Sequence, residues 1–185
     1  MCPPPNTDLA HRDHNTVLKG QTNAQGVMAD WDACAPEKIR KNAVHALEYF
    51  VGGSPEKLKA MCRAEQDAYF QKALDRLEKR HWSHNVLSAV VHRDETTPHL
   101  QALVIPLDQR GKLNARELVG GKDTLRQMET DFAKDVGLKF GLKHGVEGSK
   151  ATQRTLQEHY GWIRNPVGPD FSLPERHKGS FLGGG

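Results

Sequence analysis

The sequence predicts an α+β fold in which helices pack on one face of an antiparallel β-sheet. Two apolar runs that are rich in β-branched residues, Val86–Val91 and Leu100–Leu107, are joined by a link short enough to force them into an antiparallel pair. An earlier apolar run, Ala43–Val51, ends at two glycines and predicts a further buried strand. Segments of helical periodicity follow the first and the last of these strands, which gives the order strand, helix, strand, strand, helix.

The first helix is expected to begin at Ser54, where a hydroxyl cap, a proline and an acidic residue follow one another. We expect it to run to about Arg80 with one apolar, core-facing stripe made of Leu58, Met61, Cys62, Tyr69, Ala73 and Leu77. The second helix is expected to begin near Asp123 and to end around Gly137 or Gly141. One of its faces carries Leu125, Met128, Phe132 and Val136.

The chain is expected to have three parts. Residues 1–40 are mixed and polar, which predicts an arm of mostly irregular structure or at most a partial strand. Residues 41–163 are expected to form the core, including a short helix over 152–162. Residues 164–185 are dominated by proline and glycine, which predicts a flexible tail.

Bulk composition sets broad limits on the function. The 185 residues are 37% hydrophobic and 26% charged, as in ordinary globular proteins. No apolar run approaches the roughly 20 residues that span a bilayer, and the first residues lack the features of a secretory signal. Three scattered cysteines predict neither a disulfide framework nor a thiolate zinc site, so a reducing cytoplasm is the expected location. The net charge of +3 is only a weak sign of a polyanionic partner, and a solvated surface explains it equally well.

The link between the paired strands carries the richest chemistry. His92 and Asp94 share one face of their strand, and His99 and Gln101 share one face of the partner strand, because strand side chains alternate. Opposed residues lie roughly 4.5–5.5 Å apart at Cβ, so two imidazoles there can reach one metal ion. Nitrogen and oxygen ligands without thiolate favour Mn²⁺ or Mg²⁺, with Zn²⁺ or Ni²⁺ as adventitious ions. Asp94 or Glu95 would then orient an imidazole or take up a proton. The competing interpretation is that both histidines are ordinary polar residues near a strand end.

The pattern His-x-Asp-Glu-x-x-Pro-His over residues 92–99 resembles the metal motif of MobV-type mobilisation relaxases, the Pre/Mob plasmid recombination enzymes. Residues 39–50 and 111–116 are similar to further segments of that family, in the same order along the chain. The polar residues 12–15 resemble the segment that precedes them. The resemblance covers roughly residues 6–162, which is most of the sequence.

This resemblance implies a histidine-hydrophobe-histidine (HUH) endonuclease fold whose central antiparallel sheet carries a histidine-bound divalent metal. It also implies nicking of single-stranded or hairpin DNA at a plasmid origin of transfer, in the bacterial cytoplasm, with relaxosome or coupling proteins as further partners. The expected metal ligands are His92, His99 and Gln101, and the expected catalytic residues are Glu95, Asp94 and His14. The expected DNA contacts are Arg12, Asn15, Arg40, Lys41, Lys112 and Arg116.

Two departures from the family pattern bear on activity. The family motif usually ends in a third histidine, and Gln101 stands there. Its amide oxygen can bind a hard ion such as Mn²⁺ or Mg²⁺, but more weakly. The family also begins with an extra strand and a His-Asn-x-Arg segment that supplies the nucleophile, and this sequence is expected to start after that point. Either the nucleophile is missing or another residue serves, of which His14 is the nearest match and Tyr49 and Tyr160 are weaker ones.

Three functions are therefore compared. The leading one is a metal-dependent, DNA-nicking relaxase core. The second is a truncated, non-catalytic module that binds origin DNA. The third, a metal-dependent hydrolase of small phosphoesters, would need an enclosed pocket for which the sequence offers no argument.

Overall fold

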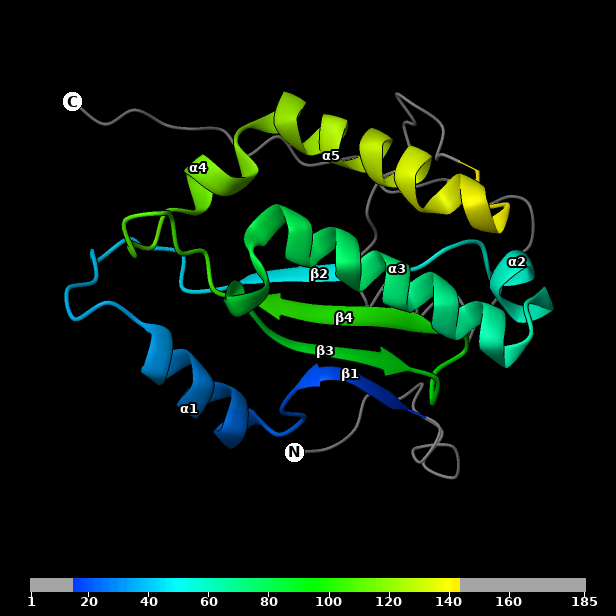
Figure 1. Cartoon of the computed structure of the whole chain (residues 1–185), viewed down its shortest axis with the longest axis horizontal. Coiled ribbons are helices and arrows are strands. Elements are labelled where there is room, and N and C mark those ends of the chain that lie inside the picture. Colours follow the sequence, from blue (N-terminus) through cyan, green and yellow to red (C-terminus); the bar gives the residue numbers. More distant parts are fainter. Residues whose placement is uncertain (1–14, 144–185) are drawn as a thin grey trace, which may run out of the picture. The chain divides into compact units, whose positions relative to one another are not determined.

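The computed structural model describes residues 15–143, which contain a four-stranded antiparallel sheet with helices against it (Figure 1). Its strands lie in the order β1-β3-β4-β2 and are β1 (Thr16–Gly20), β2 (Leu47–Val51), β3 (Val86–His92) and β4 (His99–Val104). The expected hairpin of β3 and β4 forms the centre of the sheet, with β1 paired to β3 and β2 paired to β4. The predicted α+β fold with an antiparallel sheet is confirmed.

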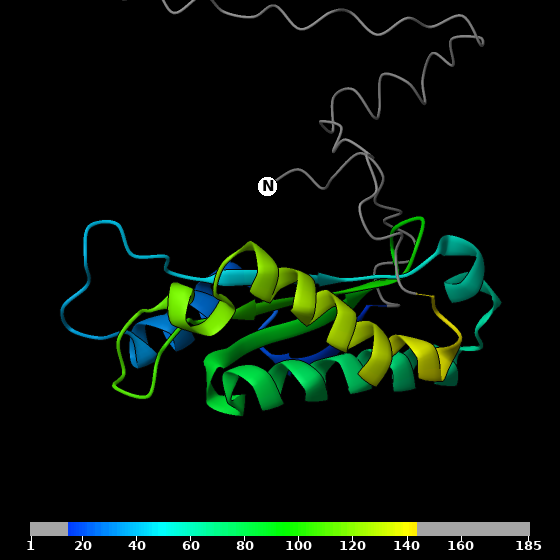
Figure 2. The same ribbon diagram turned by 90° about the horizontal axis from the view of Figure 1, so that it is seen from above.

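The helices include two that lie on the same side of the sheet, α3 and α5 (Figure 2). Their bounds and those of the shorter helices are α1 (Ala24–Cys34), α2 (Pro55–Ala60), α3 (Arg63–His81), α4 (Ala115–Val119) and α5 (Lys122–Asp135), with 3-10 turns η2 (Ser83–Asn85) and η3 (Gly137–Phe140). Among residues 15–143, no helix is both long and apolar enough to cross a lipid bilayer.

The main core lies between α3 and one face of the sheet. Alternate residues of the central strands, such as Val91 and Leu100, are fully buried there and pack with Phe70 and Leu74 of α3. The hydroxyl of Tyr69 donates a 2.8 Å hydrogen bond to the carbonyl of Gly52 and so joins α3 to the end of β2.

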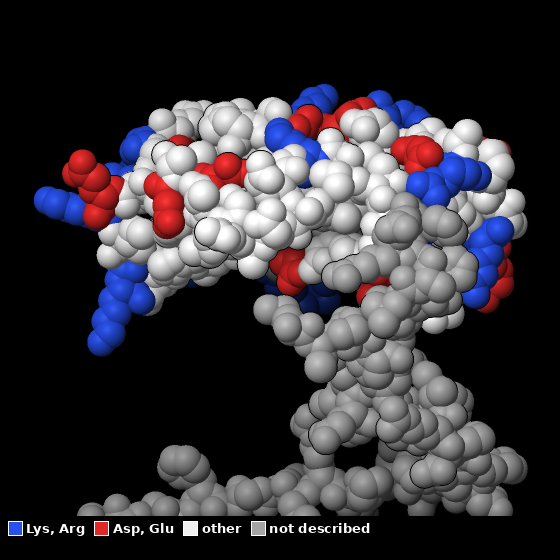
Figure 3. All heavy atoms as spheres, turned by 90° about the horizontal axis from the view of Figure 1, so that it is seen from below, with Lys and Arg blue, Asp and Glu red and all other residues white. Residues whose placement is uncertain are grey.

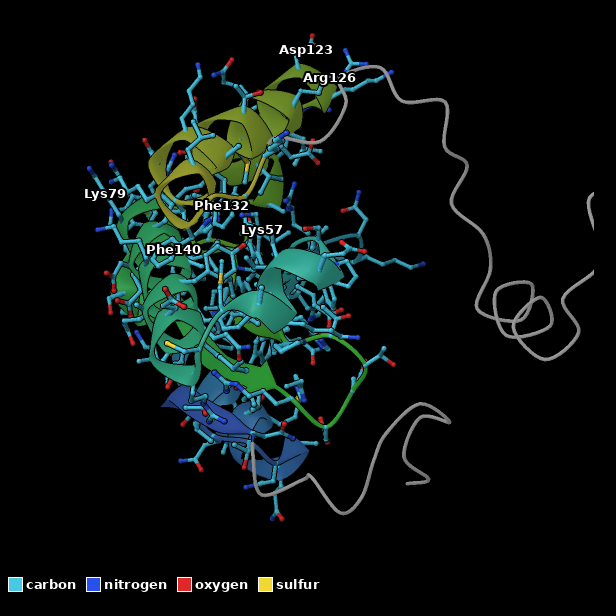
Figure 4. All side chains as sticks on the ribbon, turned by 90° about the vertical axis from the view of Figure 1, so that its right-hand side faces the viewer. Lys57, Lys79, Asp123, Arg126, Phe132 and Phe140 are labelled. Atoms are coloured by element: carbon cyan, nitrogen blue, oxygen red, sulfur yellow. The ribbon has the colours of Figure 1, made fainter. Side chains whose placement is uncertain are left out.

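A second layer of aromatic side chains closes this core from the side of α5. Phe132 of α5 and Phe140 of η3 lie where α5 approaches α3 (Figure 4). The ring of Phe140 meets the ring of Tyr69 edge to face, with centroids 5.4 Å apart. η3 is therefore attached to α3 through an aromatic contact. Of the apolar face expected for the second helix, Phe132 and Val136 pack against the core, whereas Leu125 is 46% exposed.

The single helix expected over residues 54–80 is wrong in one respect, because the chain forms two helices there. Met61 and Cys62 are extended, with ψ values of 137° and 165°, and separate α2 from α3. The backbone N–H of Cys62 donates to Glu65 Oε2 at 2.8 Å, so that Glu65 caps the start of α3. Cys62 is exposed at this helix start and does not belong to the core stripe.

Over residues 1–40 an irregular arm or a partial strand was expected. The short strand β1 agrees with the second alternative, whereas the helix α1 was not expected. β1 is a short edge strand with an irregular register between Val17 and Lys19. α1 is capped by Asn23, whose side-chain oxygen accepts the N–H of Gly26 at 2.7 Å, and none of the residues of this helix is buried. The helix expected over 152–162 and the tail expected over 164–185 lie outside the described residues.

Two strand boundaries also differ from expectation. β2 begins at Leu47, four residues later than the start of its apolar run, and β4 ends at Val104. Pro106 follows closely, and a proline has no N–H to donate to a neighbouring strand. The run to Leu107 therefore leaves the sheet and packs in a smaller cluster with Leu87, Leu113 and Trp31.

Candidate functional site

The face of the sheet that points away from the core carries the residues expected to bind metal. Antiparallel pairing sets His92 opposite His99 and Val90 opposite Gln101. Phe50 of β2 is in turn opposite Gln101. Opposed residues share a face, and we call this one the histidine face; the other, which carries Leu100, is the helix face. His92, His99 and Gln101 thus lie together, as the alternation of the strands requires.

The two imidazoles lie side by side. Their ring centroids are 5.3 Å apart and their planes differ by 24°. The carbonyl of Thr97 lies 3.1 Å from Nδ1 of His99, and because a carbonyl can only accept, Nδ1 carries the proton that is donated. In that neutral tautomer Nε2 keeps its lone pair, which is the form of histidine that binds a metal.

Asp94 is the buried carboxylate of the β3–β4 loop. Its Oδ1 lies 3.8 Å from Nδ1 of His92, which is too long for a hydrogen bond, and it has no hydrogen-bond partner among the described residues. A buried carboxylate oxygen without a partner is costly unless a proton or a cation comes close to it. The place of the Asp94 carboxylate beside His92 is that of a group that could orient the His92 ring. Glu95 is the next residue of the loop and is partly buried.

Gln101 is the least usual of the three expected metal ligands, because its side chain is a neutral amide. Its Nε2 donates a hydrogen bond to Glu48 Oε1 of β2, which leaves the amide oxygen as the atom that could meet an ion. Among residues 15–143, no three His, Cys, Asp or Glu side chains are grouped so that they could hold a metal. Two imidazoles and one amide oxygen are therefore the set that these residues offer, and it fits a hard divalent ion better than a thiolate-seeking one.

The β3–β4 loop, which carries Asp94 and Glu95, is held in place by hydrogen bonds to residues at and just before the start of β1. Asn15 Oδ1 accepts the N–H of Arg93 at 2.7 Å and that of Asp94 at 3.4 Å. The guanidinium of Arg93 donates to Thr16 Oγ1 at 2.8 Å and pairs with Asp67 of α3. Burial lowers the pKa of Arg93, and the partner carboxylate opposes that shift. Asn15, expected to contact DNA, thus uses its side-chain oxygen to hold the loop.

Sequence reasoning missed Arg93 and Asp67 as supports of the site. Arg93 follows His92 directly, at the end of its strand, and a buried arginine at such a place needs a carboxylate. The carboxylate comes from α3, 26 residues earlier, and no local pattern in the sequence links the two.

Three of the expected DNA-binding cations, Arg40, Lys112 and Arg116, flank the turn that follows β4. All three are exposed, as is Lys41, and Arg40 Nη2 donates to the carbonyl of Leu113 at 3.1 Å. Because β4 begins at His99 and runs toward this turn, the cations and the His92–His99 pair lie at opposite ends of the strand (Figure 1). The structure does not bring the two groups together.

Asp108 organises that turn. Its Oδ1 accepts the backbone N–H groups of Arg110 at 2.9 Å and Lys112 at 3.0 Å, and its Oδ2 accepts from the Arg110 guanidinium at 2.8 Å. These hydrogen bonds hold the pKa of Asp108 well below its usual range, and the largest contribution comes from the backbone N–H of Lys112. The carboxylate thus offsets the charge of Arg110 while the Lys112 side chain stays exposed.

The surface on the side of β1 and α1 carries charges of both signs. Lys and Arg (blue) and Asp and Glu (red) are interleaved there, and the basic side chains do not form one continuous stripe (Figure 3).

Tyr49, a weaker choice for the nucleophile, lies on the helix face. It pairs in register with Ala102, which is part of the core, and its hydroxyl shares a 2.6 Å hydrogen bond with Nε2 of His81. Burial raises the pKa of Tyr49. The sheet therefore separates this hydroxyl from the His92–His99 pair. Arg12, His14 and Tyr160 lie outside the described residues.

Comparison with known proteins agrees with this architecture. Residues 10–161 match the family described as plasmid recombination enzyme. The 65 kDa protein of Zymomonas mobilis subsp. mobilis is 32% identical over 167 residues, which are 88% of this chain and 28% of that protein. A plasmid recombination enzyme of Bacillus thuringiensis is 34% identical over 114 residues, which are 61% of this chain and 25% of that protein. The chain thus spans about a quarter of the length of these relatives.

Solved structures show the same fold. A Mn-bound crystal structure of the MobM relaxase domain with plasmid pMV158 oriT DNA superimposes with a TM-score of 0.77 at 20% identity, over 88% of this chain and 86% of that one. A second Mn-bound complex of the same domain gives a TM-score of 0.76. The solved structures show that the chain has the fold of the MobM relaxase domain, and the match over residues 10–161 shows that it belongs to the plasmid recombination enzyme (Mob_Pre) family.

Proposed function

We propose that this chain is a metal-dependent relaxase core that nicks single-stranded or hairpin DNA at a plasmid origin of transfer. The observation that carries the proposal is the opposed pair His92 and His99, with Gln101 beside it, on the histidine face. It is supported by membership of the plasmid recombination enzyme family and by the MobM relaxase domain, which was crystallised with oriT DNA and Mn.

His92, His99 and Gln101 would hold the divalent ion. When bound, an ion such as Mn²⁺ or Mg²⁺ polarises the scissile phosphate and offsets its developing charge. The hydrogen bond from His99 Nδ1 to the carbonyl of Thr97 leaves Nε2 as the nitrogen that would bind the ion, and Asp94, 3.8 Å from Nδ1 of His92, would orient that ring. Glu95 would take the proton of the attacking group, for which His14 is our first choice.

DNA would lie along the histidine face, between the cations at the β4 turn and the His92–His99 pair. The six residues of β4 span roughly 20 Å, at about 3.4 Å per residue. Several phosphates fit along that length, and the exposed Arg40, Lys41, Lys112 and Arg116 would contact the far ones. We place this reaction in the bacterial cytoplasm, with relaxosome or coupling proteins as further partners.

The test uses supercoiled plasmid that carries the cognate origin, with Mn²⁺ present. Open circles and a protein–DNA adduct should form with the wild-type chain and not with His99→Ala. Titration calorimetry should show that His99→Ala lowers Mn²⁺ affinity by at least about 10- to 100-fold, the cost of losing only an outer partner of a metal site. Equal Mn²⁺ affinity in a variant with an unchanged melting temperature would contradict the metal assignment.

A second candidate is a non-catalytic module that binds origin DNA. One observation favours it: the hydroxyls of Tyr49 and Tyr69, the tyrosines within residues 15–143, bond to His81 and to the carbonyl of Gly52, away from the histidine face. This candidate predicts salt-sensitive binding of hairpin DNA without nicks or adducts. If the wild-type chain converts supercoiled plasmid to a nicked product, this second candidate is excluded.

A further inference from the structure

Phe50 is an exposed aromatic residue that folding does not explain. Its side chain is 69% exposed, the highest value among the large apolar residues of the described chain. It lies on β2, at the edge of the described sheet, where an exposed aromatic side chain favours aggregation. Its neighbours on the strand, Tyr49 and Val51, face the core instead. Phe50 therefore contributes little to the core and points out from the histidine face.

The ring of Phe50 continues the row of rings that starts at the candidate metal site. It stacks on His99 with centroids 4.4 Å apart and planes 25° apart, and His99 in turn stacks on His92. Gly52 leaves room for this arrangement, since a Cβ there would lie 3.3 Å from Cε1 of Phe50. Three adjacent strands thus supply three rings in a row, and the outermost ring belongs to Phe50.

We propose that Phe50 is the stacking platform for an unpaired nucleobase of the DNA strand whose phosphate lies at His92 and His99. The inference rests on the proposed function and adds a subsite to it. One side of the phenyl ring is covered by His99, and the exposed remainder offers a flat apolar surface without hydrogen-bonding groups. Such a surface binds any base through its π-face and suits single-stranded nucleic acid.

The short ring-to-ring distances determine which nucleotide is involved. Phe50 is separated from His92 by His99 alone. A base stacked on Phe50 therefore belongs to the nucleotide whose phosphate meets the imidazoles or to its direct neighbour. Stacking there would hold the strand in register with the site, so that one phosphate is presented.

A purely structural role is the alternative. Phe50 could simply hold the His99 ring in place, in which case its loss would disturb metal binding and every DNA equally. The two roles differ in one measurable respect, because only stacking depends on the presence of one particular base.

The experiment measures dissociation constants by fluorescence anisotropy, with a labelled hairpin that carries the single-stranded origin segment. Mn²⁺ is present in one series and EDTA in another. Phe50→Ala should raise the dissociation constant roughly 5- to 150-fold, the usual effect of losing one base–aromatic stack, and Phe50→Trp should restore binding. Leu138→Ala, which removes a 59% exposed apolar side chain from η3, is the matched control and should bind as the wild type does.

The decisive series replaces one base at a time by an abasic site. The wild-type and Phe50→Ala chains should differ on every oligonucleotide except the one that lacks the stacked base, where their affinities should converge. Equal affinity of both chains for the intact DNA would overturn the inference, as would a loss that persists at every abasic position. A wild-type chain that binds no origin DNA would instead remove the proposed function itself.

Discussion

Acidification should destabilise the folded chain through one buried imidazole, that of His81. The residue is 0% exposed, its Nε2 bonds to the Tyr49 hydroxyl, and within residues 15–143 its Nδ1 has no hydrogen-bond partner. Burial, helped by the neighbouring charge of Arg80, lowers the pKa of His81 from 6.5 to about 4. A second proton on this ring would be a buried charge next to the like charge of Arg80.

The size of the effect follows from the two pKa values. The unfolded imidazole takes up a proton near pH 6.5, and the folded one only near pH 4. Between these values the unfolded chain holds the extra proton, so the free energy of unfolding falls as the pH decreases and then levels off below the folded pKa. The difference corresponds to a loss of up to about 3 kcal/mol, a large part of the stability of a small domain.

Urea denaturation at a series of pH values between 7 and 4 tests this expectation, with His81→Gln as the comparison. Glutamine can still bond to Tyr49 but does not titrate, so the variant should lose less stability over this interval, by about the same 3 kcal/mol. Carboxylates with lowered pKa values, such as Glu78, act in both chains and cancel in the difference. Parallel stability curves for the two chains would refute the assignment to His81.

Three further outcomes are expected. Gln101→His should raise Mn²⁺ affinity by about tenfold and shift the preference toward Ni²⁺ and Zn²⁺ in calorimetry, because imidazole is a better ligand than a neutral amide; an unchanged preference would show that residue 101 does not bind the ion. Asn15→Ala should cost about 1–2 kcal/mol in urea denaturation and speed hydrogen exchange at Arg93 and Asp94, whose N–H groups it leaves without an acceptor; normal protection there would contradict the anchoring role. Lys112→Ala should reduce the slope of log affinity against log salt by about 0.7 for single-stranded DNA if that lysine neutralises one phosphate, and an identical slope would exclude the contact.

The central hairpin could be predicted from the sequence because its signals are local. Val86–Val91 and Leu100–Val104 alternate or run apolar, and the loop between them is short, so the opposition of His92 and His99 follows directly. The same reasoning placed Gln101 on their face. Periodicity also predicted α5 and most of α3.

Elements without an apolar pattern were missed or placed only roughly. No residue of α1 is buried, so the helix leaves no periodic signal and was not expected, and the five-residue edge strand β1 was anticipated only as a partial strand somewhere within residues 1–40. The break between α2 and α3 was missed because Cys62 fits an apolar stripe as well as a helix cap, and only the bond to Glu65 decides between them. Contacts such as Arg93 with Asp67 join distant segments, and a sequence pattern cannot reveal them.

Successive side chains of β3 and β4 point to opposite faces of the sheet, so substitutions at neighbouring positions should have two different effects in a cell. A substitution at Val91 or Leu100 acts on the packing under α3 and should lower the amount of folded protein in a cell. A substitution one position along, at Val90 or Gln101, acts on the opposite surface and should alter which ligands are recognised at unchanged abundance. A deep mutational scan of this hairpin should therefore separate expression from recognition with a period of two residues along each strand. A variant library confined to one face, which combines the even positions of β3 with the odd positions of β4 or the reverse, could evolve one trait without selecting on the other.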